Sequence, residues 1–200
     1  MQKLHLIGVF IATLMLSSCA AVGVVTTSDP TKKLDDAGDL YQRHGRPLPA
    51  ERLIQEAITI FQAKDDVHGL GNAYREYADL LKSAAVAKWE KFYRRDGFLD
   101  KAVTYDNRLE KATEFYKISL QYYLRAEARL REENKFDSLT NVYYNMAYVH
   151  AALGNQQEEC DALDRTLDAY GENIRRNPSA KTYGSVVEMV NSVKRKKACP

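Results

Sequence analysis

Apolar residues recur every three to four positions along most of the chain, the spacing that places them on one face of an α-helix. The expected helices cover about 50–64, 70–81 with a continuation toward 93, 100 or 106 to 133, 139–153, 160–170 and 186–193. Gly97 is expected to end the second of these helices and Gly154 the fourth. A shorter pattern over 34–41 favours one more short helix. No stretch alternates with period two for long enough to indicate a sheet. The pattern therefore predicts an all-α fold.

The first nineteen residues are of a different kind. Lys3 precedes an almost uniformly apolar run from Leu4 to Met15, which is too short to span a bilayer and suits the core of a signal peptide. The sequence Leu16-Ser17-Ser18-Cys19 resembles the lipobox of bacterial lipoproteins. The resemblance implies cleavage after residue 18 and lipidation of Cys19. The alternative is an ordinary secretory signal with a small residue before the cleavage point.

These features divide the chain into three expected parts. Residues 1–18 are a lipoprotein signal peptide, 19–47 carry the lipidated cysteine and a flexible tether, and 48–200 form the helical domain. Alanines, and no aspartate, follow Cys19, and the lipoprotein sorting rule then implies anchoring in the outer membrane. We expect the domain to face the periplasm.

The charge balance bears on possible partners. Residues 1–18 contain one lysine and no acid, so the remaining chain keeps 28 basic and 27 acidic residues and a net charge of +1. Nucleic-acid binding needs a concentrated basic face, and we expect none. The basic run 194–197 is interpreted as a solvated helix end in preference to a patch for lipid headgroups.

With Cys19 assigned to lipid, two cysteines remain. Asn177-Pro178 reads as a break between two helices, with Cys160 18 residues before Pro178 and Cys199 21 residues after it. In an antiparallel hairpin both would lie about 27–31 Å from the turn, at the same level. We therefore expect a structural Cys160–Cys199 disulfide; the alternative is two unpaired thiols.

Two segments of the chain are similar to each other. The frame Leu-x-Asn-x-Tyr-x-x-Φ-Ala, in which Φ is apolar, begins at Leu70 and again at Leu139, 69 residues later. This offset is close to twice the tetratricopeptide period of about 34 residues, and the frame resembles the first helix of that repeat. The resemblance implies a solenoid of helical hairpins with a C-terminal capping helix. Residues 83–134 depart from the pattern, as either a degenerate repeat or a separate arm.

In tetratricopeptide proteins the first helices line a concave groove that binds a protein partner. Carried onto this chain, the resemblance implies a partner-binding groove with an asparagine, charged residues and tyrosines, of which the chain has 13. The implied groove residues are Asn72, Arg75, Asp79, Lys82, Asn141, Tyr144, Tyr148 and Ala151.

The sequence carries none of the common catalytic or metal-binding patterns. The histidines after residue 18 are His44, His68 and His150, far apart in sequence, and no nucleophile elbow, phosphate-binding loop or zinc motif occurs. We expect no enzyme, cofactor or metal.

The leading hypothesis is a membrane-anchored periplasmic protein-binding module that acts as scaffold or assembly factor for an envelope or secretion machine. The alternative is an immunity lipoprotein that neutralises a toxic effector acting in the periplasm. A glycan-binding or glycan-cleaving protein is the third class, and the lack of a convergent carboxylate pair argues against cleavage.

Overall fold

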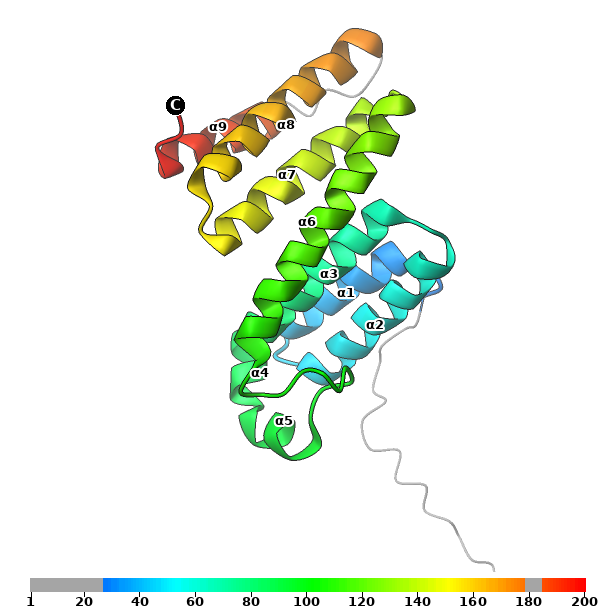
Figure 1. Cartoon of the computed structure of the whole chain (residues 1–200), viewed down its shortest axis with the longest axis vertical. Coiled ribbons are helices and arrows are strands. Elements are labelled where there is room, and N and C mark those ends of the chain that lie inside the picture. The colour runs from blue at the N-terminus through cyan, green and yellow to red at the C-terminus, as the bar shows by residue number, and fades with distance from the viewer. Residues whose placement is uncertain (1–26, 179–184) are drawn as a thin grey trace, which may run out of the picture.

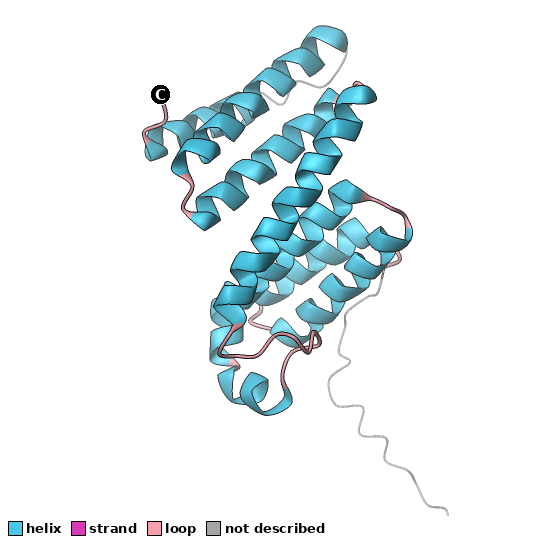
Figure 2. Ribbon diagram, in the orientation of Figure 1, coloured by secondary structure: helices cyan, strands magenta, loops and turns pink. Residues whose placement is uncertain are grey.

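The computed structural model describes residues 27–178 and 185–200, and this part of the chain consists of helices and the loops that join them (Figure 2). The helices are α1 (Pro30–Gln42), α2 (Pro47–Ala63), α3 (Val67–Lys82), α4 (Ala84–Lys88), α5 (Glu90–Asp96), α6 (Arg108–Glu132), α7 (Phe136–Leu153), α8 (Gln156–Arg176) and α9 (Ser185–Lys197). The all-α prediction is confirmed. Residues 1–26, with the expected signal peptide and Cys19, lie outside the described residues.

The helices pack in pairs. α1 packs on α2, α3 on α6 and α7 on α8, while α2–α3 and α6–α7 contacts join one pair to the next and α9 packs on α8 (Figure 1). One continuous set of buried apolar side chains runs from α1 to α9. The chain therefore forms a row of helix pairs that share a core.

The N-terminal boundary of the domain corrects one expectation. We assigned residues 19–47 to a flexible tether, but α1 belongs to the core, where Leu34, Ala37, Leu40 and Tyr41 are buried. Asp29 caps this helix by accepting a hydrogen bond from the Thr31 N–H at 2.9 Å. The apolar spacing over 34–41 did indicate a helix; the domain begins with it, at about residue 30.

The segment between α3 and α6 also differs from expectation. The helix that begins at 67 stops at Lys82, because Ser83 adopts an extended conformation and its hydroxyl accepts a hydrogen bond from the Val86 N–H at 3.2 Å. The short helices α4 and α5 follow, and Gly97, with φ +74°, ends α5 as predicted. Residues 83–107 thus form an excursion at one end of the molecule (Figure 1).

A buried carboxylate holds this excursion to the core. Glu51 on α2 is 1% exposed and accepts hydrogen bonds from the Leu99 N–H at 2.7 Å and the Tyr77 hydroxyl at 3.0 Å. The rings of Tyr93 and Phe98 stack with their centroids 4.1 Å apart, which closes the loop on itself. Residues 97–107 are therefore fixed to α2 and α3.

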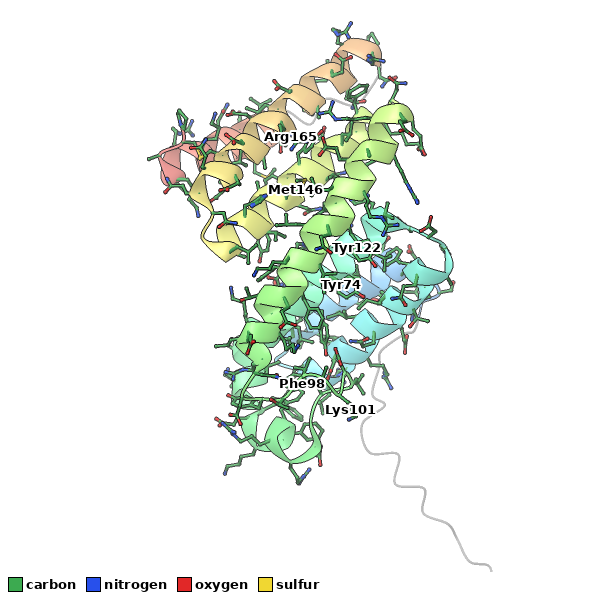
Figure 3. The ribbon with its side chains drawn as sticks, in the orientation of Figure 1. Tyr74, Phe98, Lys101, Tyr122, Met146 and Arg165 are labelled. Carbon is green, nitrogen blue, oxygen red and sulfur yellow. A yellow bond between two sulfur atoms is a disulfide. The ribbon has the colours of Figure 1, made fainter. Side chains whose placement is uncertain are left out.

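α3 and α6 approach each other closely. The Ser119 hydroxyl of α6 donates to the Gly71 carbonyl oxygen at 2.8 Å, and the ring of Tyr123 covers the Gly71 Cα. One turn further along, Tyr74 of α3 stacks on Tyr122 of α6 at 5.5 Å, and the two rings lie beside the same stretch of α6 in Figure 3. A glycine at 71 is what permits this packing distance.

The C-terminal helix is clamped as the cysteine spacing predicted. Cys160 and Cys199 form a disulfide with their Cα atoms 5.5 Å apart. Next to it, the Gln156 side-chain amide donates to the Lys197 carbonyl oxygen at 2.6 Å. Gly154, with φ +80°, ends α7 at the predicted position. α9 is thus fixed to the start of α8.

Candidate binding groove

An open cavity of about 500 Å³ lies between α1, α3 and α7. We call it the α1–α3–α7 cavity. Three helices from distant parts of the sequence contribute its walls, and most of the lining side chains are polar or charged. The lining residues are Thr31, Leu34, Asp35, Gly38, Asp39 and Gln42 of α1, Arg43 directly after it, Asn72, Arg75 and Glu76 of α3, and Asn145 of α7.

Arg75 and Asp79 of α3 organise one side of this cavity. The Arg75 guanidinium lies 3.2 Å from Asp79 and 3.3 Å from Glu76. Asp79 also accepts hydrogen bonds from the hydroxyls of Tyr148 at 2.9 Å and of Tyr116. The guanidinium carbon stands 5.3 Å from the centre of the Tyr148 ring. The two tyrosine hydrogen bonds to Asp79 therefore connect α3 to both α6 and α7.

Asn72 makes the second connection. Its side-chain oxygen accepts hydrogen bonds from the Tyr123 hydroxyl at 2.7 Å and from the Asn145 amide at 3.1 Å. Asn145 lines the cavity from α7, so this bond joins the α7 wall of the cavity to the α3 wall. Asn72 and Asn145 both line the cavity, so their side-chain amides could form hydrogen bonds with a peptide backbone.

Glu76 is a buried acidic residue in the cavity wall. Burial raises the pKa of its carboxyl, while the Arg75 guanidinium and a 2.9 Å hydrogen bond from the Tyr41 hydroxyl favour its ionised form. The Gly38 Cα of α1 lies opposite, and a Cβ atom there would stand 3.1 Å from the Glu76 Oε1. α1 therefore comes close to α3 at this point and closes the cavity on one side.

The eight residues expected in the groove fall into two groups. Asn72 and Arg75 line the cavity, Asp79 forms an ion pair with Arg75, and Tyr148 donates a hydrogen bond to Asp79. The other four do not line it: Lys82 lies over the Tyr116 ring at 5.2 Å, Asn141 is exposed, Tyr144 packs at the edge of the core and Ala151 is half-buried.

Sequence reasoning missed the contribution of α1 and of Asn145. The repeat frame equates Asn72 with Asn141, but the structure places Asn72 against Asn145, one helical turn further along α7. Asp35, Asp39 and Gln42 of α1 also line the cavity and are not among the expected groove residues. The signal for α1 is its apolar spacing over 34–41, which predicts a helix packed on the core.

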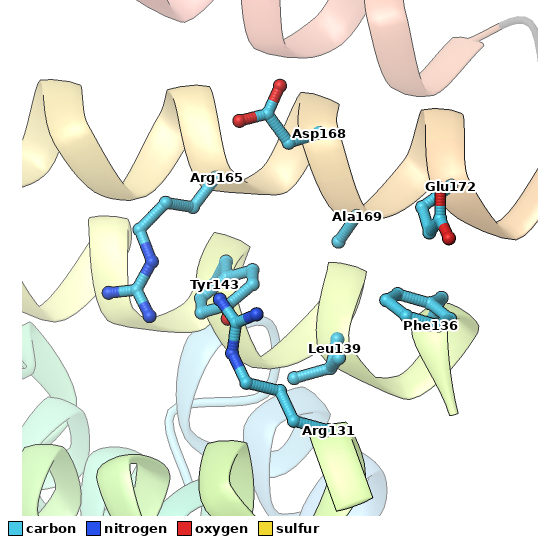
Figure 4. Close-up of a pocket in the computed structure, with 8 residues that line it drawn as sticks. All are labelled: Arg131, Phe136, Leu139, Tyr143, Arg165, Asp168, Ala169 and Glu172. Atoms are coloured by element: carbon cyan, nitrogen blue, oxygen red, sulfur yellow. The ribbon is translucent and has the colours of Figure 1, made fainter. Parts of the chain in front are cut away.

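A smaller pocket of about 260 Å³ lies between α6, α7 and α8, and we call it the α6–α7–α8 pocket (Figure 4). Arg131 and Arg165 reach it from the two outer helices, on either side of the Tyr143 ring of α7. It shares no lining residue with the α1–α3–α7 cavity.

The two inner histidines are apart from both cavities. His68 and His150 each have one buried ring nitrogen without a hydrogen-bond partner, and burial lowers the pKa of both imidazoles. No cluster of three or more His, Cys, Asp or Glu side chains suited to a metal ion occurs within 27–178 and 185–200. In the same ranges no helix is long and apolar enough to cross a membrane.

Comparison with known proteins adds no family. The chain matches no protein-family model, no curated protein sequence and no solved structure at a significant level.

Proposed function

We propose that this chain is a non-enzymatic protein-binding module that holds a segment of its partner in the α1–α3–α7 cavity. The observation that carries the proposal is the make-up of the cavity wall. Three separate helices supply amide, carboxylate and guanidinium groups to one open cavity of about 500 Å³. Such a surface can form hydrogen bonds to a peptide backbone and ion pairs to its side chains.

We infer that the helix pairs are degenerate tetratricopeptide-like hairpins, with α9 as the capping helix. Two observations support this inference. α1, α3 and α7 are the first members of their pairs, and all three line the cavity. Ala78 and Ala147, the small residues of the repeat frame, are both buried where helices meet. On this interpretation residues 83–107 are an insertion within the second hairpin.

The place of action follows from the N-terminal sequence. We propose that Cys19 carries lipid and anchors the chain to the outer membrane, with the helical domain in the periplasm and the partner a component of an envelope or secretion machine. The Cys160–Cys199 bond supports a location outside the cytoplasm, because structural disulfides persist in oxidising compartments.

The experiment is capture of partners from the source cell envelope by the lipid-free protein that begins at residue 19, followed by binding measurements with the purified partner. The test variant combines Tyr148→Ala with Asn145→Ala. The control is Leu124→Ala, which truncates a 54% exposed side chain on α6 outside the cavity. We expect the test variant to weaken binding at least about tenfold, since contacts at the centre of an interface carry most of its free energy.

Equal binding by the test and control variants would refute the cavity as the binding site. Capture of one envelope-machine component would identify the scaffold function. Capture of a single secreted toxin, bound one to one and inactivated, would instead identify an immunity protein. Retention of glycan fragments alone would refute protein binding as the function.

A further inference from the structure

The α6–α7–α8 pocket lies on the other side of α7 from the proposed partner site. Phe136 lines this pocket, whereas Asn145 lines the α1–α3–α7 cavity. The two residues are nine positions apart, or about two and a half helical turns, so they project from opposite faces of α7. A ligand in this pocket would therefore leave the larger cavity open.

A single carboxylate holds the two arginines of the pocket in place. The Oε1 atom of Glu127 accepts hydrogen bonds from the Arg131 Nε–H at 3.1 Å and the Tyr143 hydroxyl at 3.0 Å, and it forms an ion pair with Arg165. Burial alone would raise the pKa of the Glu127 carboxyl, but these donors hold the pKa below its usual value. Glu127 is therefore ionised at neutral pH and fixes both guanidinium groups.

The single carboxylate of Glu127 neutralises only one of the two positive charges of Arg131 and Arg165. Glu127 is the one carboxylate bonded to Arg131 and Arg165 in the described part of the chain. Of the two acids that line the pocket, Glu172 is bonded to a different pair of arginines on α8. The carboxylate of Asp168 points away from both guanidinium groups in Figure 4. One positive charge at this position lacks a partner.

The free hydrogen-bond donors are accessible. Arg131 bonds to Glu127 through Nε and also interacts with Tyr143, which leaves other N–H groups of its guanidinium for a ligand, and its side chain is 55% exposed. The Arg165 guanidinium carbon lies 4.1 Å from the centre of the Tyr143 ring, so its plane is supported by the ring. Both groups are positioned before any ligand arrives, which reduces the entropic cost of binding.

Apart from the two arginines and the acids Asp168 and Glu172, the pocket lining is apolar or aromatic. Phe136, Leu139 and Ala169 line the part beyond Tyr143. Guanidinium groups bind carboxylates through paired, charge-assisted hydrogen bonds, and an apolar surface beside them favours a ligand whose carboxylate is attached to hydrocarbon. We propose that the α6–α7–α8 pocket binds a carboxylate carried by a compact apolar group, such as a chain-terminal aliphatic residue or a free organic acid.

The test uses the ¹⁵N-labelled protein and N-acetyl-leucine, with N-acetyl-leucine amide as the uncharged counterpart. We expect the acid, and not the amide, to shift backbone resonances of α7 and α8 around Tyr143 in a saturable way. The peptide Gly-Gly-Gly-Leu distinguishes the two sources of such a ligand. Tighter binding of the peptide than of N-acetyl-leucine would indicate a chain terminus, and equal binding a free acid.

Arg131→Gln is the test variant, and Arg129→Gln on the same helix is its matched control. Arg129 pairs with Asp65 at 2.7 Å, away from the pocket. Loss of one charged hydrogen bond predicts about tenfold weaker binding of the acid to Arg131→Gln, and unchanged binding to the control. Urea unfolding of both variants checks that they fold equally well. Equal binding of acid and amide, equal affinity of the two variants, or no shift with 20 mM acid as the probe would overturn the proposal.

Discussion

Replacing Gly71 by alanine tests the close contact between α3 and α6. A Cβ atom at this position would lie 2.6 Å from the Cδ1 and Cε1 atoms of Tyr123. Carbon atoms in contact are usually about 3.5–4.0 Å apart, so the ring would have to move by about 1 Å. Tyr123 is completely buried, and its hydroxyl is bonded to Asn72. The ring therefore has no space to enter without separating the helices or breaking that bond.

The expected magnitude combines three effects. Overpacking of a buried site costs about 1–3 kcal/mol, and the strained Tyr123–Asn72 hydrogen bond costs about 1 kcal/mol more. Alanine, however, is favoured over glycine inside a helix by about 1 kcal/mol. We expect Gly71→Ala to lower the free energy of unfolding by about 1–3 kcal/mol.

Gly171 provides the matched control. It lies within α8, and a Cβ atom there would meet no other atom within 4 Å. Only the helix preference then applies, so Gly171→Ala should raise the free energy of unfolding by up to about 1 kcal/mol. Urea unfolding followed by far-ultraviolet circular dichroism measures both variants. A Gly71→Ala protein as stable as the parent, or a destabilised Gly171→Ala protein, would refute the reasoning.

Three further predictions concern other parts of the fold. Cys199→Ser should release α9 from α8, because the disulfide that closes this loop is worth roughly 4 kcal/mol. Amide hydrogen exchange in α9 should then speed up by up to about a thousandfold, and unchanged exchange would contradict a stabilising role of the disulfide. Glu51→Ala should cost about 2–4 kcal/mol in urea unfolding because it leaves the buried Tyr77 hydroxyl and the part-buried Leu99 N–H without their acceptor, whereas Glu51→Gln keeps an acceptor and should cost less; equal losses would count against this account. Because burial holds the pKa of His68 below its usual 6.5, the unfolded chain takes up the proton first. Stability should therefore fall as the pH drops below about 6.5, and His68→Gln should reduce that slope in unfolding experiments at pH 7.5 and 5.5.

Local patterns predicted the helices well because they depend on neighbouring residues. The apolar spacing located α2, α6, α7 and α8, and Gly97 and Gly154 ended their helices where expected. The disulfide was predictable because two helices joined by a turn fix the separation of their cysteines.

The remaining features depend on contacts between distant residues. The apolar spacing predicts a continuous helix through Ser83. The structure shows that its hydroxyl instead accepts a hydrogen bond from the Val86 N–H and caps the next helix. Likewise Asn145 gave no sign that it would meet Asn72, because the relative shift of α3 and α7 is set by packing and not by the repeat frame. Lys82, Asn141, Tyr144 and Ala151 lie outside the α1–α3–α7 cavity, and their part in partner binding stays a prediction.

The position of α1 couples the N-terminal segment mechanically to the cavity. The chain enters the domain at Pro30, and the next thirteen residues, 31–43, include every lining residue that α1 and its end contribute. Tension applied to the chain before Pro30 therefore acts first on α1, which forms one wall of the cavity. The apolar contacts of Leu34 and Leu40 and the Lys33–Glu56 ion pair hold this helix in place. If the chain is tethered through its N-terminus, tension in the tether and a ligand in the cavity act on the same helix. Tension would then change the affinity of the cavity for its ligand, and a bound ligand would change how far α1 moves under tension.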